Sequence, residues 1–550
     1  MTRLSCILVA AAAVSAVPAQ NVFQGNGVPS AYVQNTPGVL GQQLVLAFGS
    51  PTTPLPLAIV GVSDGIGPVF VPHPLLGNIG LDLFSPAYQA LTFPLDPNGD
   101  GAVLLSLPPG FPLASDPPLF LHAATFEATG LSISKTVRVE WANPDGWEPV
   151  AALGTARQLH TATALGSGPL DNVTEVLICG GATGSFIVPT PMASAELYSP
   201  LTRTTSALPA LSLPRASHRA ARLPDGRVLV TGGVTTGGIV TATCEFFDPQ
   251  TLTFVPAPAM LAPRAGHALT LLDDGRVLAT GGVADWQNAG VNFIAALNTA
   301  QNSAEVFDPV AGTWSALPPM ASPRLGHSHT VLLDGRVLVV SGISGGYSGA
   351  LGGLGSGQVP FYTGTCETFD PATDTFTSVA PLQHLDPGAP PFFPSFNYIG
   401  RAFHGAVLLP TGDVLVTGGF VAQQPTGQTN DETIVCGFGD VWQASTDTWN
   451  VVASLPTGAA FGAALPFRGG ALVCGGFSGP LTQLATTPLL ALHDGVTVTP
   501  LANLGVDGAS GVAAPRGGHS MTALYDGTFL VYGGGVWPTT IGTGFVYTPQ

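Results

Sequence analysis

The sequence predicts an all-β protein, a seven-bladed β-propeller preceded by a small β-sandwich domain. Three observations carry this prediction. A unit of about fifty to eighty residues recurs seven times, and repeats of this kind are typical of propellers and solenoids. Each unit contains four short apolar segments, which is the number of strands in a propeller blade. The 550 residues include 71 Gly and 51 Pro, which favours short strands joined by tight turns.

The repeated unit opens with an Arg-x-x-His motif and is clearest at Arg215-Ala-Ser-His218. An apolar segment, the turn Asp225-Gly226, a second apolar segment and the pair Gly232-Gly233 follow. Asp-Gly supplies the positive φ angles of a tight hairpin, so the two segments are predicted as strands one and two. A seventh unit, near Phe461, lacks the motif but keeps a Gly-Gly pair. The six motifs are Arg157 with His160, Arg215 with His218, Arg264 with His267, Arg324 with His327, Arg401 with His404 and Arg516 with His519.

These arginines and histidines are expected to be structural. A residue that recurs in nearly every blade serves blade geometry, since one active site has no use for six copies. Buried arginines need anionic or carbonyl partners, so we predict bonds to the acids of strand three or to backbone carbonyls between blades. A metal held by histidines that converge on the axis is the alternative, and we expect no metal. The acids are Glu196, Glu245, Glu305, Glu367 and Asp440.

The pattern resembles the kelch family: Gly-Gly follows strand two, and aromatic residues such as Phe307 and Trp314 stand in strands three and four. The resemblance covers Asp145 to Gln550. This part of the chain is similar to the central domain of galactose-oxidase-like proteins. It implies the propeller fold but no particular function. The copper-radical relatives carry an adjacent Tyr-His pair, and none of the nine tyrosines here precedes a histidine. We therefore expect neither copper oxidation nor any cofactor.

The chain divides into three predicted segments. Residues 1–19 have the pattern of a secretory signal, with Arg3, an apolar run and a small-residue cleavage site. Residues 20–143 are a predicted β-sandwich accessory domain. Residues 144–550 are the propeller, and 144–154 close its last blade by supplying a missing fourth strand. No later segment approaches the length of a membrane span, so we expect a secreted or cell-surface protein without membrane insertion.

Composition narrows the partners and the role of the cysteines. The net charge is −17 and Lys135 is the only lysine, so we expect no binding to nucleic acid or anionic membrane. Five cysteines remain after the signal, an odd number that leaves at least one thiol without an internal partner. We expect all five cysteines to be small, buried residues of strands. They are Cys179, Cys244, Cys366, Cys436 and Cys474.

The loops that differ between units are the candidate binding site. Connections between strands two and three share one face of a propeller with the links between blades, and such loops carry function. In blades three to five they are long and rich in aromatic, Asn and Asp residues, which suit stacking on a sugar ring and bonding to its hydroxyls. The alternative is that the aromatics pin the loops to the propeller. The candidates are Trp286, Asn288, Phe293, Tyr347, Tyr362, His384, Asp386, Phe392, Phe393 and Tyr398.

The preferred hypothesis is a secreted, non-enzymatic binding protein that uses the blade three-to-five loop face for a glycan or an extracellular protein. The second is a carbohydrate-active enzyme of the kelch type, an epimerase or lyase, with a site at the mouth of the central channel. Such a site needs acids or imidazoles outside the repeat, and His329, His384 and Asp386 are the few candidates. The third is a structural cell-surface module.

Overall fold

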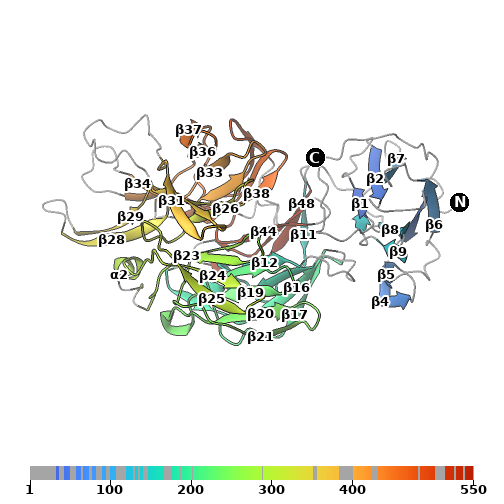
Figure 1. Cartoon of the computed structure of the whole chain (residues 1–550), viewed down its shortest axis with the longest axis horizontal. Coiled ribbons are helices and arrows are strands. Elements are labelled where there is room, and N and C mark those ends of the chain that lie inside the picture. Colours follow the sequence, from blue (N-terminus) through green and yellow to red (C-terminus); the bar gives the residue numbers. More distant parts are fainter. Residues whose placement is uncertain are drawn as a thin grey trace.

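The computed structural model confirms an all-β protein with a seven-bladed propeller (Figure 1). It describes residues 146–550 except 166–174, 186, 201, 288, 291, 351–355, 383–399, 424–431, 481–483, 502–514, 525–527, 537–538 and 549–550, and before residue 146 only strands β1 to β10. Helix in these residues is confined to the 3₁₀ turn η1 (Thr236–Gly238) and to α2 (Phe293–Leu297). Neither has the length and hydropathy needed to cross a bilayer.

Each blade is a four-stranded antiparallel sheet, and its first strand lies nearest the axis. Blade one is β12 (Thr161–Ala164), β13 (Val176–Cys179), β16 (Ala195–Ser199) and β17 (Thr204–Leu208), and blade two is β18 (Arg219–Arg222), β19 (Val228–Thr231), β20 (Cys244–Asp248) and β21 (Thr253–Ala257). Blade three is β22 (Ala268–Leu271), β23 (Val277–Thr280), β24 (Ala304–Asp308) and β25 (Thr313–Leu317), and blade four is β26 (Ser328–Val331), β27 (Val337–Val340), β30 (Cys366–Asp370) and β31 (Thr375–Val379). Blade five is β32 (Gly405–Leu408), β33 (Val414–Thr417), β36 (Gly439–Gln443) and β37 (Thr448–Val452), and blade six is β38 (Ala463–Phe467), β39 (Gly470–Cys474), β42 (Leu490–His493) and β43 (Val498–Pro500).

Blade seven joins the two ends of the propeller sequence. It contains β44 (Ser520–Ala523), β45 (Phe529–Tyr532), β48 (Gly544–Thr548) and, as its outermost strand, β11 (Gly146–Val150). Strands β11 and β48 pair from Gly146 with Thr548 to Val150 with Gly544 and lie side by side in Figure 1. The Trp147 ring packs on Tyr547 with centroids 4.9 Å apart. This pairing closes the ring of blades without a covalent link and leaves β48 no open edge.

The hydrophobic core lies between the blades. Strand two of every blade is buried along its whole length, because both of its faces pack against neighbouring blades. Cys179 and Cys474 end this strand where Thr231, Thr280 and Thr417 end it elsewhere. All five described cysteines are buried free thiols, as expected. Burial raises the pKa of Cys179 to about 11, so this thiol stays protonated at neutral pH.

Two closed circles of backbone hydrogen bonds join the seven blades. The first circle runs through the third residue of each Arg-x-x-His motif and through its equivalent in blade six. The N–H of each of these residues donates to the carbonyl of the equivalent residue in the preceding blade, at 2.7–3.3 Å. We call these residues the axial ring. All of them have positive φ, a conformation that costs a non-glycine residue about 1–2 kcal/mol. The axial ring is Leu159, Ser217, Gly266, Gly326, Phe403, Phe461 and Gly518.

The second circle explains the repeated glycine pairs. The N–H of the second residue donates to the carbonyl of the first motif residue in the next blade, for example Gly233 to Arg264 at 2.8 Å. At the first residue, Gly232, a Cβ would meet the Arg264 carbonyl oxygen, the Met260 methyl group and His267 of the next blade. The pair is therefore glycine in six of the seven blades, because the neighbouring backbone comes close to this position; in blade four Ser341 replaces the first glycine and also has a positive φ.

We expect Gly232→Ala to lower the free energy of unfolding by at least about 3 kcal/mol, since it adds a backbone clash to an unfavourable φ. Gly226→Ala in the same blade is the matched control: φ there is also positive, but a Cβ meets no atom within 4 Å. That control is expected to lose about 1 kcal/mol. Urea unfolding of both variants measures the difference, and equal losses would refute the close-approach explanation.

The connections between strands two and three all emerge on one face. In blade two the connection contains η1 and in blade three it contains α2, which Asn292 caps by accepting the Ala295 N–H. Five blades carry a small hairpin there. The hairpins are β14 (Ala182–Gly184) with β15 (Pro189–Pro191), β28 (Ile343–Ala350) with β29 (Ser356–Tyr362), β34 (Phe420–Gln423) with β35 (Glu432–Val435), β40 (Phe477–Ser478) with β41 (Ala485–Thr486), and β46 (Gly535–Val536) with β47 (Thr539–Thr540).

The N-terminal strands form two sheets and a hairpin. A three-stranded sheet has the order β1-β2-β7, and a five-stranded sheet has the order β10-β8-β3-β6 with β9 also paired to β8. The assignment of residues 20–143 as a sandwich domain stays a prediction. The strands are β1 (Tyr32–Asn35), β2 (Gln43–Gly49), β3 (Leu57–Ser63), β4 (Ile66–His73), β5 (Gly77–Leu81), β6 (Gln89–Pro94), β7 (Asp100–Ser106), β8 (Leu119–Glu127), β9 (Gly130–Ile133) and β10 (Val137–Val139).

Candidate functional site

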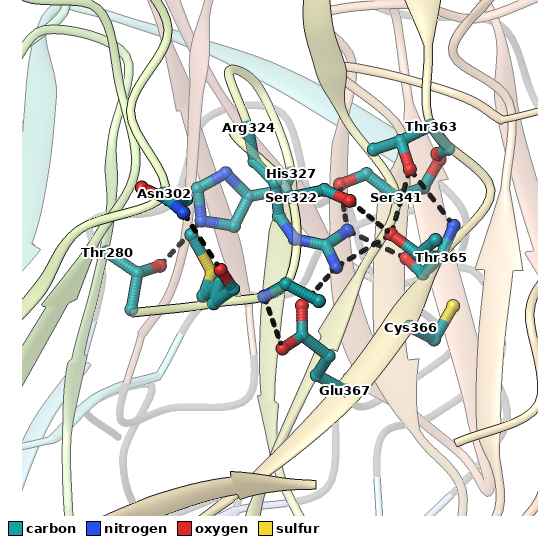
Figure 2. A network of polar contacts seen from close by, with 12 residues as sticks. Thr280, Asn302, Ser322, Arg324, His327, Ser341, Thr363, Thr365, Cys366 and Glu367 are labelled. Carbon is teal, nitrogen blue, oxygen red and sulfur yellow. Dashed lines mark hydrogen bonds and ion pairs between the residues drawn. The ribbon is translucent and has the colours of Figure 1, made fainter. Parts of the chain in front are cut away.

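The repeated arginines are clamps inside single blades. In blade four the Arg324 guanidinium is fully buried, and its Nη1 donates to the carbonyls of Ser341 and Thr365 at 2.9 and 2.7 Å (Figure 2). Its Nη2 pairs with Glu367 Oε1 at 2.6 Å, and Glu367 Oε2 accepts the Ala321 N–H at 2.9 Å. The clamp thus holds strand three and the link from blade three together. Its carbonyl partners belong to the arginine's own blade, not to a neighbouring one.

The same clamp recurs with equivalent partners in four other blades, where each arginine pairs with the acid of strand three. Blades six and seven depart from it. Ala459 and Ala491 replace the arginine and the acid of blade six and join a hydrophobic cluster. In blade seven Phe545 takes the acid's place, and the Arg516 guanidinium lies 5.0 Å from its ring centroid. Burial lowers the pKa of Arg516 to about 10, so the guanidinium remains charged at neutral pH.

The repeated histidines bond neighbouring blades together instead of converging on the axis. In five motifs Nε2 lies 2.7–3.0 Å from a Thr or Ser hydroxyl of the preceding blade, as in His327 with Thr280. Burial is the main cause that lowers the pKa of His160 and His404 to about 3, so both are neutral at pH 7. Among the described residues, no group of three or more His, Cys, Asp or Glu side chains is arranged to hold a metal ion.

Loss of the motif in blade six interrupts this chain of histidine contacts on both sides. Gly462 stands where the histidine would be, and the Thr417 hydroxyl of blade five, which would face it, has no hydrogen-bond partner in the described chain. In the other blades the hydroxyl partner stands at the start of strand one or at the end of strand two. Blade six has Ala463 and Cys474 at these two positions, so His519 of blade seven lacks a hydroxyl partner. Both orphaned groups therefore follow from the one degenerate motif.

A pocket opens above the axial ring on the face of the strand two–three connections. Five ring residues line its floor: Leu159, Ser217, Gly266, Phe403 and Phe461. It contains about 690 Å³ of space not filled by atoms, part of which is open to solvent. The walls come from blades one to five, and nearly all of their side chains are apolar. The wall residues are Pro189, Val234, Ala265, Val283, Trp286, Phe293, Leu297, Leu325, Ile343, Pro360, Tyr362, Phe420 and Thr433.

Contacts across the face hold the aromatic walls in place. The Trp286 indole N–H of blade three donates to the Ile187 carbonyl of blade one at 2.8 Å, and the Phe293 ring packs edge-on against the indole at 5.8 Å. On the other side Phe403 stacks on Phe461 with ring centroids 4.0 Å apart. These contacts fix the rings before any ligand arrives, which reduces the entropy that binding costs.

The pocket has few polar groups. Ser217, Thr433 and Tyr362 supply its only lining hydroxyls among the described residues, and the Tyr362 hydroxyl lies 3.5 Å from Thr433 Oγ1. Burial raises the pKa of Tyr362 far above its ordinary value, so its hydroxyl stays neutral. No described lining residue is an acid, an imidazole, a thiol or a cation. The chemistry of this lining suits an apolar group, which would be held by burial and not by polar contacts.

The structure brings together part of the predicted loop set. Trp286, Phe293 and Tyr362 line one pocket although they come from two blades. The side chain of Tyr347 and all of Asn288, His384, Asp386, Phe392, Phe393 and Tyr398 lie outside the described residues. His329 is not at the pocket: it is on β26, where the Thr270 and Thr280 hydroxyls bond both of its ring nitrogens at 2.9 and 2.8 Å.

The prediction from the variable loops did not include the residues of the pocket floor. Phe403 and Phe461 occupy the third motif position, which the repeat analysis treated as variable. A signal was present, because that position is glycine in three of the seven units, at Gly266, Gly326 and Gly518. Glycine recurring at one site of a repeat indicates a positive φ. Side chains at the same site in the other units then point over the axis.

The chain is similar to one family model and to solved structures. The kelch motif model matches residues 263–321, which contain blade three. A fungal alcohol oxidase solved in complex with copper is similar in structure, with a TM-score of 0.51, 16% identity, and coverage of 74% of this chain and 77% of that one. The structure of YjhT aligns with a TM-score of 0.44 and 17% identity, over 64% of this chain and 99% of that one. No curated protein is detectably similar in sequence.

The chain is a seven-bladed β-propeller in which blade three matches the kelch motif and the same motif residues recur in the other blades. The likeness to the alcohol oxidase concerns the fold. The described residues do not fit a copper centre, because the described tyrosines and histidines have other roles. Tyr198 and Tyr532 pack against each other in the core, and His493 bonds the Ala453 carbonyl.

Proposed function

We propose that this chain is an extracytoplasmic, non-enzymatic binding protein whose pocket above the axial ring takes an apolar side chain of a protein ligand. The observation that carries the proposal is the lining itself: rigid aromatic and aliphatic walls around a preformed space, with three hydroxyls and no charged group among the described residues. A buried apolar anchor in such a pocket supplies most of the affinity at protein interfaces.

The same lining favours a protein ligand over a glycan. A sugar ring exposes hydroxyl groups all round, and burying them without partners is costly. Of the three lining hydroxyls, that of Tyr362 already faces Thr433. An aliphatic or aromatic side chain has no hydroxyl groups that need hydrogen-bond partners in the pocket. The carbohydrate-active enzyme has less support, because the described lining offers no acid–base group for catalysis.

The location outside the cytoplasm is proposed from the sequence. Arg3, the apolar run of residues 7–17 and the small residues before Gln20 have the pattern of a cleaved secretory signal. Terminal sequencing of protein recovered from culture medium tests this point: a mature chain that begins at Gln20 supports it, and protein retained in the cytoplasm with residue 1 intact contradicts it.

Trp286→Ala is expected to weaken ligand binding about 30-fold, as for the loss of an aromatic hot spot. A random peptide library and a glycan array are screened in parallel against the wild type, and the variant's dissociation constants are measured for whatever binds. Trp449→Ala is the matched control, because that indole also donates to a carbonyl, of Ala380 at 2.8 Å, but stands on the outermost strand of blade five.

The proposal is supported if the selected peptides share an aliphatic or aromatic residue, lose binding in Trp286→Ala and keep it in Trp449→Ala. Glycan binding that depends on Trp286 would instead assign the pocket to a sugar. Peptides that bind both variants as tightly as the wild type would place the site elsewhere. Both of these results contradict the proposal.

A further inference from the structure

The strands that line the central channel contain two arginines and no acidic residue. The first strands of the seven blades contact one another in a closed circle around the axis. Their sequences contain no Asp or Glu, and Arg219 and Arg222, both on β18, are their only cations other than histidine. The positions equivalent to Arg219 in the next blades are small, for example Ala268 and Ser328, and they leave room for its long side chain.

Arg219 differs from the six clamp arginines in its partners. Its Nε donates to the His267 carbonyl of blade three at 2.8 Å, so the side chain reaches from its own blade to the next. Its Nη1 and Nη2 have no acceptor within the described chain, and the side chain is half-buried instead of sealed between strands. By contrast, the Arg324 Nη atoms bond two carbonyls, a hydroxyl and a carboxylate.

The charge of Arg219 acts on histidines of the next two blades. Burial is the main cause that lowers the pKa of His329, to about 3, and Arg219 is the next. It contributes in the same direction at His267, again after burial. No carboxylate offsets the effect of burial on Arg219 itself, whose pKa is lowered. The channel therefore presents two free guanidinium donors in a confined and positive environment.

We propose that the channel binds a small inorganic anion, a halide or an oxyanion such as phosphate, at Nη1 and Nη2 of Arg219. An unpaired guanidinium in a confined site is costly, and an anion that accepts from both nitrogens offsets that cost. The low dielectric of the walls strengthens the attraction relative to water. This site is distinct from the pocket: it lies on β18, two residues beyond Ser217 of the axial ring, and shares no lining residue with the pocket.

The test compares the thermal unfolding midpoint in sodium chloride, sodium phosphate and sodium gluconate at equal ionic strength, with gluconate as the bulky organic anion for comparison. The wild type is expected to unfold at a higher temperature in chloride or phosphate than in gluconate. The midpoint should rise by about 2 °C per tenfold increase of the bound anion above its Kd. Chloride and phosphate in separate arms distinguish a halide site from an oxyanion site.

Arg219→Gln should abolish the dependence on the anion, and Arg227→Gln should retain it. Arg227 is a partly exposed arginine of the same blade that pairs with Asp225, so it controls for loss of one positive charge. Equal wild-type midpoints in all three salts, or an unchanged dependence in Arg219→Gln, would overturn the proposal. Crystals of the wild type soaked in bromide give an independent test that needs no variant: anomalous density at the Arg219 guanidinium supports the site, and density only elsewhere contradicts it.

Discussion

Arg324→Ala is expected to lower the free energy of unfolding by about 3–5 kcal/mol, because it leaves the buried carboxylate of Glu367 without its cation. Glu367 is 2% exposed, and its remaining partner is the Ala321 N–H. The carbonyls of Ser341 and Thr365 lose a donor as well. Urea unfolding at pH 7 measures the loss, with the midpoint and slope fitted together.

The double variant Arg324→Ala with Glu367→Ala is expected to regain at least half of that loss. Blade six supports this expectation, since the chain already replaces the pair there by Ala459 and Ala491 within a hydrophobic cluster. A buried ion pair is often no more stabilising than apolar residues that fill its space, whereas breaking it is costly. A double variant as unstable as the sum of the two single variants would refute the coupling of the pair.

The protein is expected to lose stability steeply as the pH falls below about 6.5. Unfolded histidines take up protons near their ordinary pKa of 6.5, whereas burial lowers the pKa of His160, His404 and His519 to about 3 in the folded protein. The pKa values of His218, His267 and His327 are also well below 6.5. Between the two pKa values the unfolded state binds more protons, so acid favours unfolding and the free energy of unfolding falls.

Each histidine contributes up to about 1.4 kcal/mol per pH unit, so six contribute up to about 8 kcal/mol per unit, comparable to the whole stability of many domains. Urea unfolding between pH 7.5 and pH 5 measures the slope. His404→Gln, in which the amide retains a bond to Ser328, should reduce the slope by about 1.4 kcal/mol per unit. A free energy of unfolding that is constant between pH 7 and pH 5 would contradict the description of the histidines as buried and neutral.

The repeat made the architecture predictable, since glycine pairs, Asp-Gly turns and strand-three acids recur in most of the blades. The acids were identified as arginine partners because a buried guanidinium has few alternatives. The expectation that the carbonyl partners lie between blades was wrong: Ser341 and Thr365 belong to the arginine's own blade. Spacing along the chain does not reveal on which side of a blade a long side chain turns.

The pocket was only half predictable from sequence. Long aromatic loops marked Trp286, Phe293 and Tyr362, but the Ile187 carbonyl that orients Trp286 comes from blade one, 99 residues away. Phe403 and Phe461 stand in the repeat itself, and their positive φ carries them over the axis. Such a floor forms only when seven units close into a circle, so no single unit contains the information.

The crystal structure of the protein bound to the tightest peptide from the library tests the central claim most directly. We expect one apolar side chain of the peptide to lie in the pocket, in contact with Trp286 and Phe461 and above the axial ring. A peptide bound on another face, with the pocket left as it is in the free protein, would contradict the account.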